Sequence, residues 1–190
     1  MNRFSAVVMT ALVASLCFLD SARAANALET ALVTCWSCHG AEGLPHDPTV
    51  PIIQGQQAKY LEKQLRDFRE GDREDQIMSS MAESIPFKDL ARAAELIAAK
   101  TWPARPVEGA PAAEPGVVAT CKACHGDTLM GGPSPEGFAP RLSGQFAEYL
   151  DAQMGTFARG QRANQKSMTA MMKSLGADER SALAKYLAGL

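Results

Sequence analysis

The chain is poor in several features that mark common classes of protein. Aromatic residues make up 6% of its 190 residues, and only three histidines are present. No basic tract occurs and the formal net charge is −2, which argues against a nucleic-acid-binding function. Alternation of apolar and polar residues, the pattern of half-buried strands, is almost absent. With 46% hydrophobic and 21% charged residues, the sequence predicts a globular all-α protein of one medium domain or two small ones.

Cysteine is scarce too, and its placement is informative. Cys17 lies near the N-terminus, and the other four cysteines form two Cys-x-x-Cys-His-Gly motifs, over residues 35–40 and 121–126. Cys-x-x-Cys-His is the attachment signature of c-type haem. Residues three apart in a helix share a face, so both thiols can form thioethers with one porphyrin while the next residue reaches its iron. The predicted attachment residues are Cys35, Cys38, Cys121 and Cys124, and the predicted iron ligands are His39 and His125.

Two other chemistries use a Cys-x-x-Cys pair. A thioredoxin-like redox centre lies in a βαβ unit, which the near absence of strand patterns disfavours. A four-cysteine zinc site usually brings its pairs closer in sequence than the 86 residues between Cys35 and Cys121. We therefore predict two covalently bound c-type haems. They would leave no cysteine after residue 24 for a disulfide or a thiolate ligand.

Residues 1–24 have the pattern of a secretory signal peptide. Arg3 supplies the positive start, residues 6–19 form an apolar run, and Ala22-Arg23-Ala24 is a suitable cleavage site. The run is short for a transmembrane span, although a retained membrane anchor stays open. Export of a chain with c-type haem motifs predicts a location in the bacterial periplasm.

The remainder of the chain is an internal repeat. A tyrosine, a phenylalanine and a glycine follow Gly55 by 5, 13 and 16 residues, and the same offsets follow Gly144. Each half therefore predicts a small helical domain, which we call domain 1 (25–100) and domain 2 (117–190), joined by a proline-rich linker (101–116). Helices are expected over 26–38, 57–70, 87–100, 145–159 and 178–190, with loops between them.

Each iron needs a second axial ligand. The third histidine, His46, lies in a Gly-Pro loop seven residues after His39 and has no counterpart in domain 2, so we expect it to be exposed. Methionine is the better candidate, because thioether ligation raises the reduction potential relative to two imidazoles. Methionines recur in both halves in the segment before the last helix, where loops are expected.

Met78 and Met168 are the predicted methionine ligands. Each lies seven residues before the apolar residue that precedes the last helix of its half. Met81 and Met171, three residues later, stay open as alternatives. A single methionine often only fills a core, but recurrence in both halves favours ligation.

Two further pairs of residues recur in the repeat, one of prolines and one of arginines, and the sequence leaves two roles open for each pair. Pro51 and Pro140 follow the motif histidines by 12 and 15 residues; a carbonyl near each could accept the imidazole Nδ1–H, or the prolines could simply shape loops. Arg73 and Arg162 recur just before the methionine segments. They could pair with haem propionates or be exposed to solvent.

Together these motifs resemble those of the dihaem cytochrome c4 family. The pattern Cys-x-x-Cys-His-Gly, Pro-x-Ile/Leu-x-Gly-Gln, Tyr-Leu, Phe-x-x-Gly-x-Arg, Met occurs twice and covers nearly the whole chain after residue 24. The resemblance implies two cytochrome c domains about a pseudo-twofold axis, His/Met-ligated haems and proline carbonyls bonded to the histidines. It also implies a periplasmic electron carrier rather than an enzyme. Implied partners are redox proteins such as a terminal oxidase or a quinol-oxidising complex, with loose membrane association in some members.

Other functions stay open beside this one. Related dihaem chains are electron-transfer subunits of periplasmic dehydrogenases, for example flavin-containing sulfide dehydrogenases. A haem enzyme, such as a peroxidase or a thiosulfate-oxidising type, would need an exchangeable ligand, often histidine or cysteine, and only His46 is spare.

The halves also differ. Domain 1 carries 8 basic and 12 acidic residues and domain 2 carries 8 and 6, an asymmetry that could orient docking. The last helix of a domain in the cytochrome c4 family normally carries an aromatic residue. Domain 2 has Tyr186 there and domain 1 has Leu96, so domain 1 is expected to be looser or to have a more open haem edge.

Overall fold

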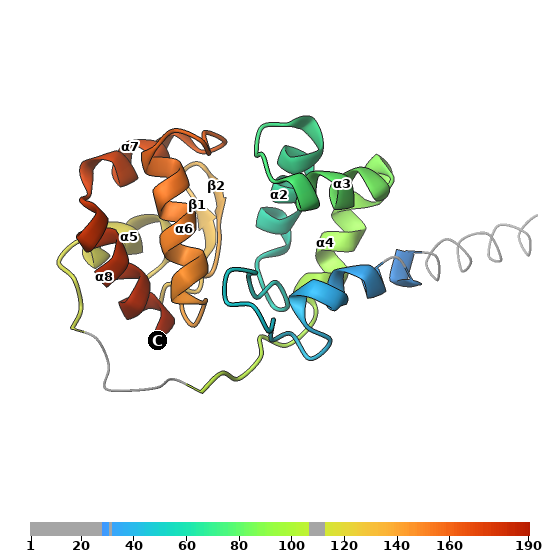
Figure 1. Ribbon diagram of the computed structural model, residues 1–190, viewed down its shortest axis with the longest axis horizontal. Helices are drawn as coiled ribbons and strands as arrows, with labels where there is room; N and C mark the ends of the chain where they lie inside the picture. The colour runs from blue at the N-terminus through green and yellow to red at the C-terminus, as the bar shows by residue number, and fades with distance from the viewer. Residues whose placement is uncertain (1–27, 31, 107–112) are drawn as a thin grey trace, which may run out of the picture.

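Two clusters of buried apolar side chains divide the molecule as the repeat predicts, one in each half. The computed structural model describes residues 28–30, 32–106 and 113–190, and the predicted signal peptide lies outside them. The two halves lie side by side (Figure 1). Among the described residues, no helix has the length and apolar character needed to cross a bilayer.

Domain 1 is a small helical bundle. Residues 32–39 are helical and carry the first motif. They are followed by α2 (Ala58–Glu70), α3 (Gln76–Ser84), the 3₁₀ helix η1 (Phe87–Asp89) and α4 (Leu90–Ala98). α2 is amphipathic, and its buried Leu61, Leu65 and Phe68 face α3 and α4. Gly71 ends α2 in the left-handed region (φ 83°), which favours glycine.

Domain 2 repeats this arrangement with one addition. Its elements are α5 (Val118–His125), β1 (Gly132–Ser134), β2 (Gly137–Ala139), α6 (Ala147–Ala158), α7 (Lys166–Ser174) and α8 (Ala177–Ala188). β1 and β2 form an antiparallel hairpin in which Gly132 pairs with Ala139. α6 packs against both α7 and α8, as α2 packs against α3 and α4 in domain 1.

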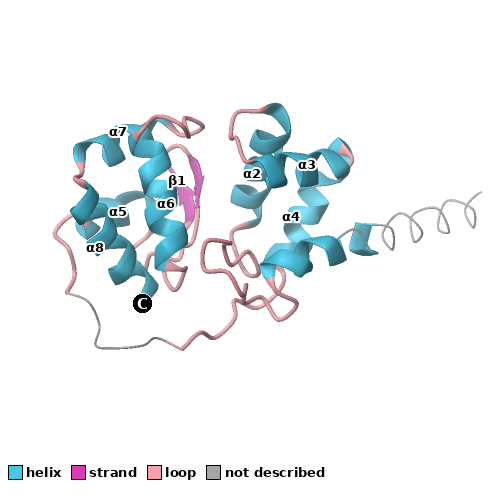
Figure 2. Cartoon of the chain, viewed as in Figure 1, coloured by secondary structure: helices cyan, strands magenta, loops and turns pink. Residues whose placement is uncertain are grey.

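The structure corrects the sequence prediction in two places (Figure 2). The methionine segments, expected to be loops, are the short helices α3 and α7. Each of these helices buries only one side chain, Ala82 in α3 and Met172 in α7, so neither shows a broad apolar face. Asp75 precedes α3 as its N-cap, and its carboxylate accepts from the N–H groups of Ile77 and Met78. The stretch 131–137, also expected to be loop, holds β1 and the start of β2. These three-residue strands show no alternation, and β2 contacts α2 of domain 1.

Candidate functional site

The first motif lies at the C-terminal end of the helix that includes residues 32–39. Cys35 is half-buried, Cys38 is exposed and His39 is buried, with 6% of its surface exposed. Neither cysteine is in a disulfide bond. The helix ends at Gly40, where φ is 83° and a Cβ atom would lie 2.3 Å from the carbonyl oxygen of Leu44. Glycine is therefore required for the chain to turn directly after the histidine.

The second motif has the same arrangement at the end of α5. Cys121 is half-buried, Cys124 is exposed and His125 is buried, with 5% of its surface exposed. Gly126, with φ 79°, ends the helix. Neither Cys121 nor Cys124 is in a disulfide bond. Each half thus presents two thiols three residues apart beside a buried imidazole.

Each of these histidines is held by a backbone carbonyl. Nδ1 of His39 lies 2.8 Å from the carbonyl oxygen of Pro51, and Nδ1 of His125 lies 2.9 Å from that of Pro140. Burial lowers the pKa of both imidazoles, and the carbonyl bonds oppose this only in part. A neutral ring that donates from Nδ1 keeps the lone pair of Nε2 for a metal. With the adjacent thiols, this donor set fits a covalently attached haem.

The four candidate methionines lie at matching places. Met78 and Met168 are the third residues of α3 and α7. Met81 and Met171 follow three residues later, on the same helix face. All four are half-buried, and the structure does not choose between the two in each half. Met172, by contrast, is buried in the domain 2 core with 2% of its surface exposed.

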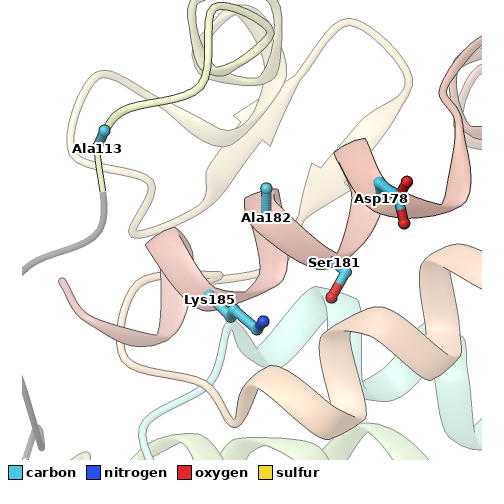
Figure 3. A pocket seen from close by; sticks show the side chains of 5 residues that line it. All are labelled: Ala113, Asp178, Ser181, Ala182 and Lys185. Carbon is cyan, nitrogen blue, oxygen red and sulfur yellow. The ribbon is translucent and has the colours of Figure 1, made fainter.

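His46 is exposed, as predicted. A separate surface hollow of about 440 Å³ lies along α8. It is lined by Ala113 and by Asp178, Ser181, Ala182 and Lys185 of α8 (Figure 3). None of the predicted haem-site residues lines it, so it is separate from both sites.

Two glutamines bind the domains together through backbone hydrogen bonds. The side chain of Gln145 donates from Nε2 to the carbonyl of Ile52 at 2.9 Å and accepts the Ile52 N–H at Oε1 at 3.0 Å. The side chain of Gln56 forms the same pair with Arg141, at 3.0 and 2.7 Å. Each glutamine thus pairs with the residue after the histidine-binding proline of the other domain.

Two arginines meet at the centre of the interface. Oε1 of Gln64 accepts from Arg73 and from Arg162, both at 2.7 Å. Oε1 of Gln153 accepts from the same two arginines, at 2.8 and 2.7 Å. Both guanidinium-bearing residues have only 7% of their surface exposed. The alternative that Arg73 and Arg162 are exposed to solvent is therefore wrong.

The partners of this arginine pair carry no formal charge. Beyond the glutamines, Arg73 donates to the Tyr149 hydroxyl at 3.2 Å, and Arg162 donates to the Tyr60 hydroxyl at 3.3 Å and to Asn164 at 3.1 Å. Burial alone would raise the pKa of Tyr60, but the two guanidinium groups outweigh it and lower that pKa. Two carboxylates lie near the pair. Against the effect of burial, Asp75 helps to raise the pKa of Arg73, and buried Asp67 is paired with Lys63 and accepts from Gln64 and Asn164. Neither is hydrogen-bonded to a guanidinium group in the part of the chain that the structure describes, so the two buried cations favour a further anionic group.

The start of the predicted linker packs against domain 2. The Arg141 guanidinium lies over the Trp102 ring, 4.2 Å from its centroid. Arg105 lies over the Phe146 ring at 5.3 Å and donates to the carbonyl of Ala188. This part of the proline-rich segment therefore adds to the contact between the halves.

No local feature of the sequence indicates a role for the interface glutamines. Gln56 and Gln145 belong to the repeated Gly-Gln pattern, and Gln64 and Gln153 each lie nine residues after the glycine of that pattern. The only indication in the sequence is that these glutamines occupy equivalent positions in the two repeats. Equivalent positions do not reveal which residues the side chains contact.

The chain is similar in sequence and in structure to known proteins. The Cytochrome c family model matches residues 116–190. The chain is 32% identical to the thiosulfate dehydrogenase electron acceptor of Stutzerimonas stutzeri, over 84% of this chain and 80% of the relative. It is 30% identical to the cytochrome c4 of Pseudomonas aeruginosa, over 82% of this chain and 83% of the relative. The solved structure of Acidithiobacillus ferrooxidans cytochrome c4 is similar with a TM-score of 0.72 and 28% identity, covering 84% of this chain and 99% of that one.

Proposed function

Because the chain belongs to the cytochrome c4 family, we propose that it carries single electrons between protein partners of a respiratory chain in the bacterial periplasm. It is a c-type cytochrome with two covalently bound haems, an electron-transfer protein and not an enzyme. Each bound haem supplies an iron that takes up and releases one electron. The roles of the protein's own residues in this are proposals.

The motif residues hold and orient the haems. Cys35 and Cys38 form the thioethers in domain 1, and Cys121 and Cys124 form them in domain 2. His39 and His125 bind the irons through Nε2, each fixed in orientation by its proline carbonyl. Met78 and Met168 would supply the second ligand of each iron, with Met81 and Met171 as the alternatives. Ligation on both sides leaves no open position for a substrate.

The arginine pair suits the haem propionates. Arg73 and Arg162 are buried side by side on neutral hydrogen-bond partners. Asp75 compensates Arg73 without a hydrogen bond, and a buried charge that is incompletely compensated is costly. Carboxylates at the interface would neutralise both. This supports haems whose propionate edges approach the contact between the domains.

One observation carries the proposal. The two histidine–carbonyl pairs are equivalent, and both proline segments are hydrogen-bonded to the opposite domain. The interface therefore holds two matched haem sites as one unit. That arrangement suits transfer between linked haems rather than chemistry at a single one.

A spectrum of the exported protein tests the proposal. We expect two haems per chain and a methionine–iron charge-transfer band from both oxidised haems. Rapid binding of cyanide or carbon monoxide to one haem would contradict it, because that haem would then have an open or exchangeable ligand.

Besides respiratory-chain proteins, a thiosulfate dehydrogenase is a candidate electron donor for this protein. A relative 32% identical to this chain is described as the electron acceptor of such an enzyme. With a purified thiosulfate dehydrogenase and thiosulfate, reduction of this protein should be fast and saturable if the enzyme is its donor. Co-purification with a catalytic chain would favour a fixed subunit, and a free pool that also reduces a terminal oxidase would favour a mobile carrier.

A further inference from the structure

The peptide group between Pro51 and Ile52 is hydrogen-bonded at both ends. Its carbonyl oxygen, on Pro51, lies 2.8 Å from Nδ1 of His39. Its N–H, on Ile52, donates to Oε1 of Gln145 at 3.0 Å. One peptide unit therefore connects a side-chain amide of domain 2 to the proposed iron ligand of domain 1.

The peptide group between Pro140 and Arg141 repeats the arrangement in the opposite direction. Its carbonyl oxygen lies 2.9 Å from Nδ1 of His125. Its N–H donates to Oε1 of Gln56 at 2.7 Å. The two connections cross the interface, because the glutamine of each domain acts on the histidine of the other.

Both glutamine amides are locked in one orientation. Oε1 of Gln145 also accepts the N–H of Phe146 at 3.0 Å, and Oε1 of Gln56 also accepts the N–H of Gln57 at 2.9 Å. The exposed fractions of Gln145 and Gln56 are 2% and 5%. A flipped amide would face two N–H donors with its own NH₂ group. Leaving such buried donors unpaired costs about 1–3 kcal/mol each.

We propose that Gln56 and Gln145 are positioning residues that tune the iron-binding strength of the histidine in the opposite domain. The proposal rests on the histidine ligation given under the proposed function. A peptide whose N–H donates is polarised, so its carbonyl becomes a better acceptor, with a gain of about 10–30% per bond in a chain. A stronger bond at Nδ1 makes the imidazole more basic toward its metal. A more basic ligand favours oxidised iron and lowers the reduction potential.

Docking of the domains therefore contributes to the potential of each haem. Domain 2 lowers the potential at His39 through Gln145, and domain 1 lowers the potential at His125 through Gln56. The interface thus does more than hold the haems close together. It makes the potential of each one depend on contact with the other domain.

Substituting each glutamine in the holoprotein tests the crossed pattern. An NMR-monitored redox titration with assigned haem resonances measures the two potentials separately. Gln145→Leu should raise the potential of the domain 1 haem more than that of the domain 2 haem. It should also shift the His39 Nδ1–H resonance of the reduced protein upfield. Gln56→Leu should produce the reverse, acting on the domain 2 haem and on His125.

Two further variants control for loosening of the interface. Gln57 donates from Nε2 to the carbonyl of Met130 at 2.9 Å, a contact between the domains that touches neither proline peptide. Gln57→Ala should leave both potentials unchanged. Gln145→Glu keeps an acceptor oxygen in place, so the potential at His39 should stay the same or fall.

The outcomes separate the inference from the proposed function. Equal shifts at both haems, a shift mainly in the substituted domain, or the same rise with Gln145→Glu as with Gln145→Leu would overturn the inference. The proposed function would survive each of these results, because the haem count and methionine band would be intact. Absence of those signals in the unaltered protein would instead overturn the proposed function.

Discussion

The two domains share a site geometry but fill their cores differently. The histidine–carbonyl distances are 2.8 and 2.9 Å, and each buried arginine lies 4.4 Å from the phenylalanine ring it covers. The cores diverge where Met172 of domain 2 replaces Ala82 and Leu183 replaces Ala93. Domain 1 instead buries Leu28 of its first helix. Hydrogen bonds thus preserve the site, while apolar volume is redistributed between elements.

Loss of a cysteine pair should have the largest effect. The double variant Cys35→Ser/Cys38→Ser should lose the domain 1 haem and keep that of domain 2, because in the proposed function each motif holds its own porphyrin. Cys121→Ser/Cys124→Ser should do the opposite. Haem content per chain and the mass of each tryptic haem peptide measure this. A variant that still holds two covalent haems would contradict the proposal that each motif attaches one haem.

Methionine substitutions should change one haem at a time. Met78→Ala should abolish the methionine–iron band of domain 1, and Met168→Ala that of domain 2, because the thioether ligand is lost. Met81→Ala and Met171→Ala are the matched controls and should leave both bands in place. If the controls lose the band instead, the ligands are the residues one turn later.

The difference in core filling should appear in stability. Met172→Ala should lower the free energy of unfolding by about 2–5 kcal/mol, because the side chain is buried and its loss leaves a cavity. The reverse change, Ala82→Met, should cost about 1–3 kcal/mol through overpacking. Urea unfolding of the holoprotein measures both. Met172→Leu is the volume-conserving control, and a cost for it as large as that of Met172→Ala would argue against a cavity effect.

The arginine pair should give a smaller effect than Met172→Ala. Arg73→Met and Arg162→Met should each cost about 1.5–3 kcal/mol, the range for hydrogen bonds to charged groups. Arg162→Met should cost more, because its Nε also donates to Asn164. The double variant should cost less than the sum, since both arginines share the oxygens of Gln64 and Gln153. Additive costs would show that the pair does not act as one network.

Much of this protein could be predicted from local sequence. The haem motifs depend on residues three and four apart, and α2 and α6 follow from apolar residues at helical spacing. The sequence does not predict the helices α3 and α7, because each buries a single side chain, Ala82 or Met172, and so lacks a broad apolar face. The burial of Arg73 was left open because a charged side chain beside a turn is normally exposed. Only its position at the domain interface shows that it is covered.

The sequence by itself determined the two attachment motifs, the repeat and the helical class, because each depends on neighbours within a few turns of chain. The tertiary structure decided which groups meet across the interface. Gln145 pairs with Ile52, 93 residues away, and Gln56 with Arg141, 85 residues away. Repeat register shows that both glutamines occupy equivalent positions, but their partners depend on how the two folded domains pack. Because of that packing, the N–H of each proline peptide donates to a glutamine of the other domain. The two equivalent haem motifs are therefore linked to each other across the interface.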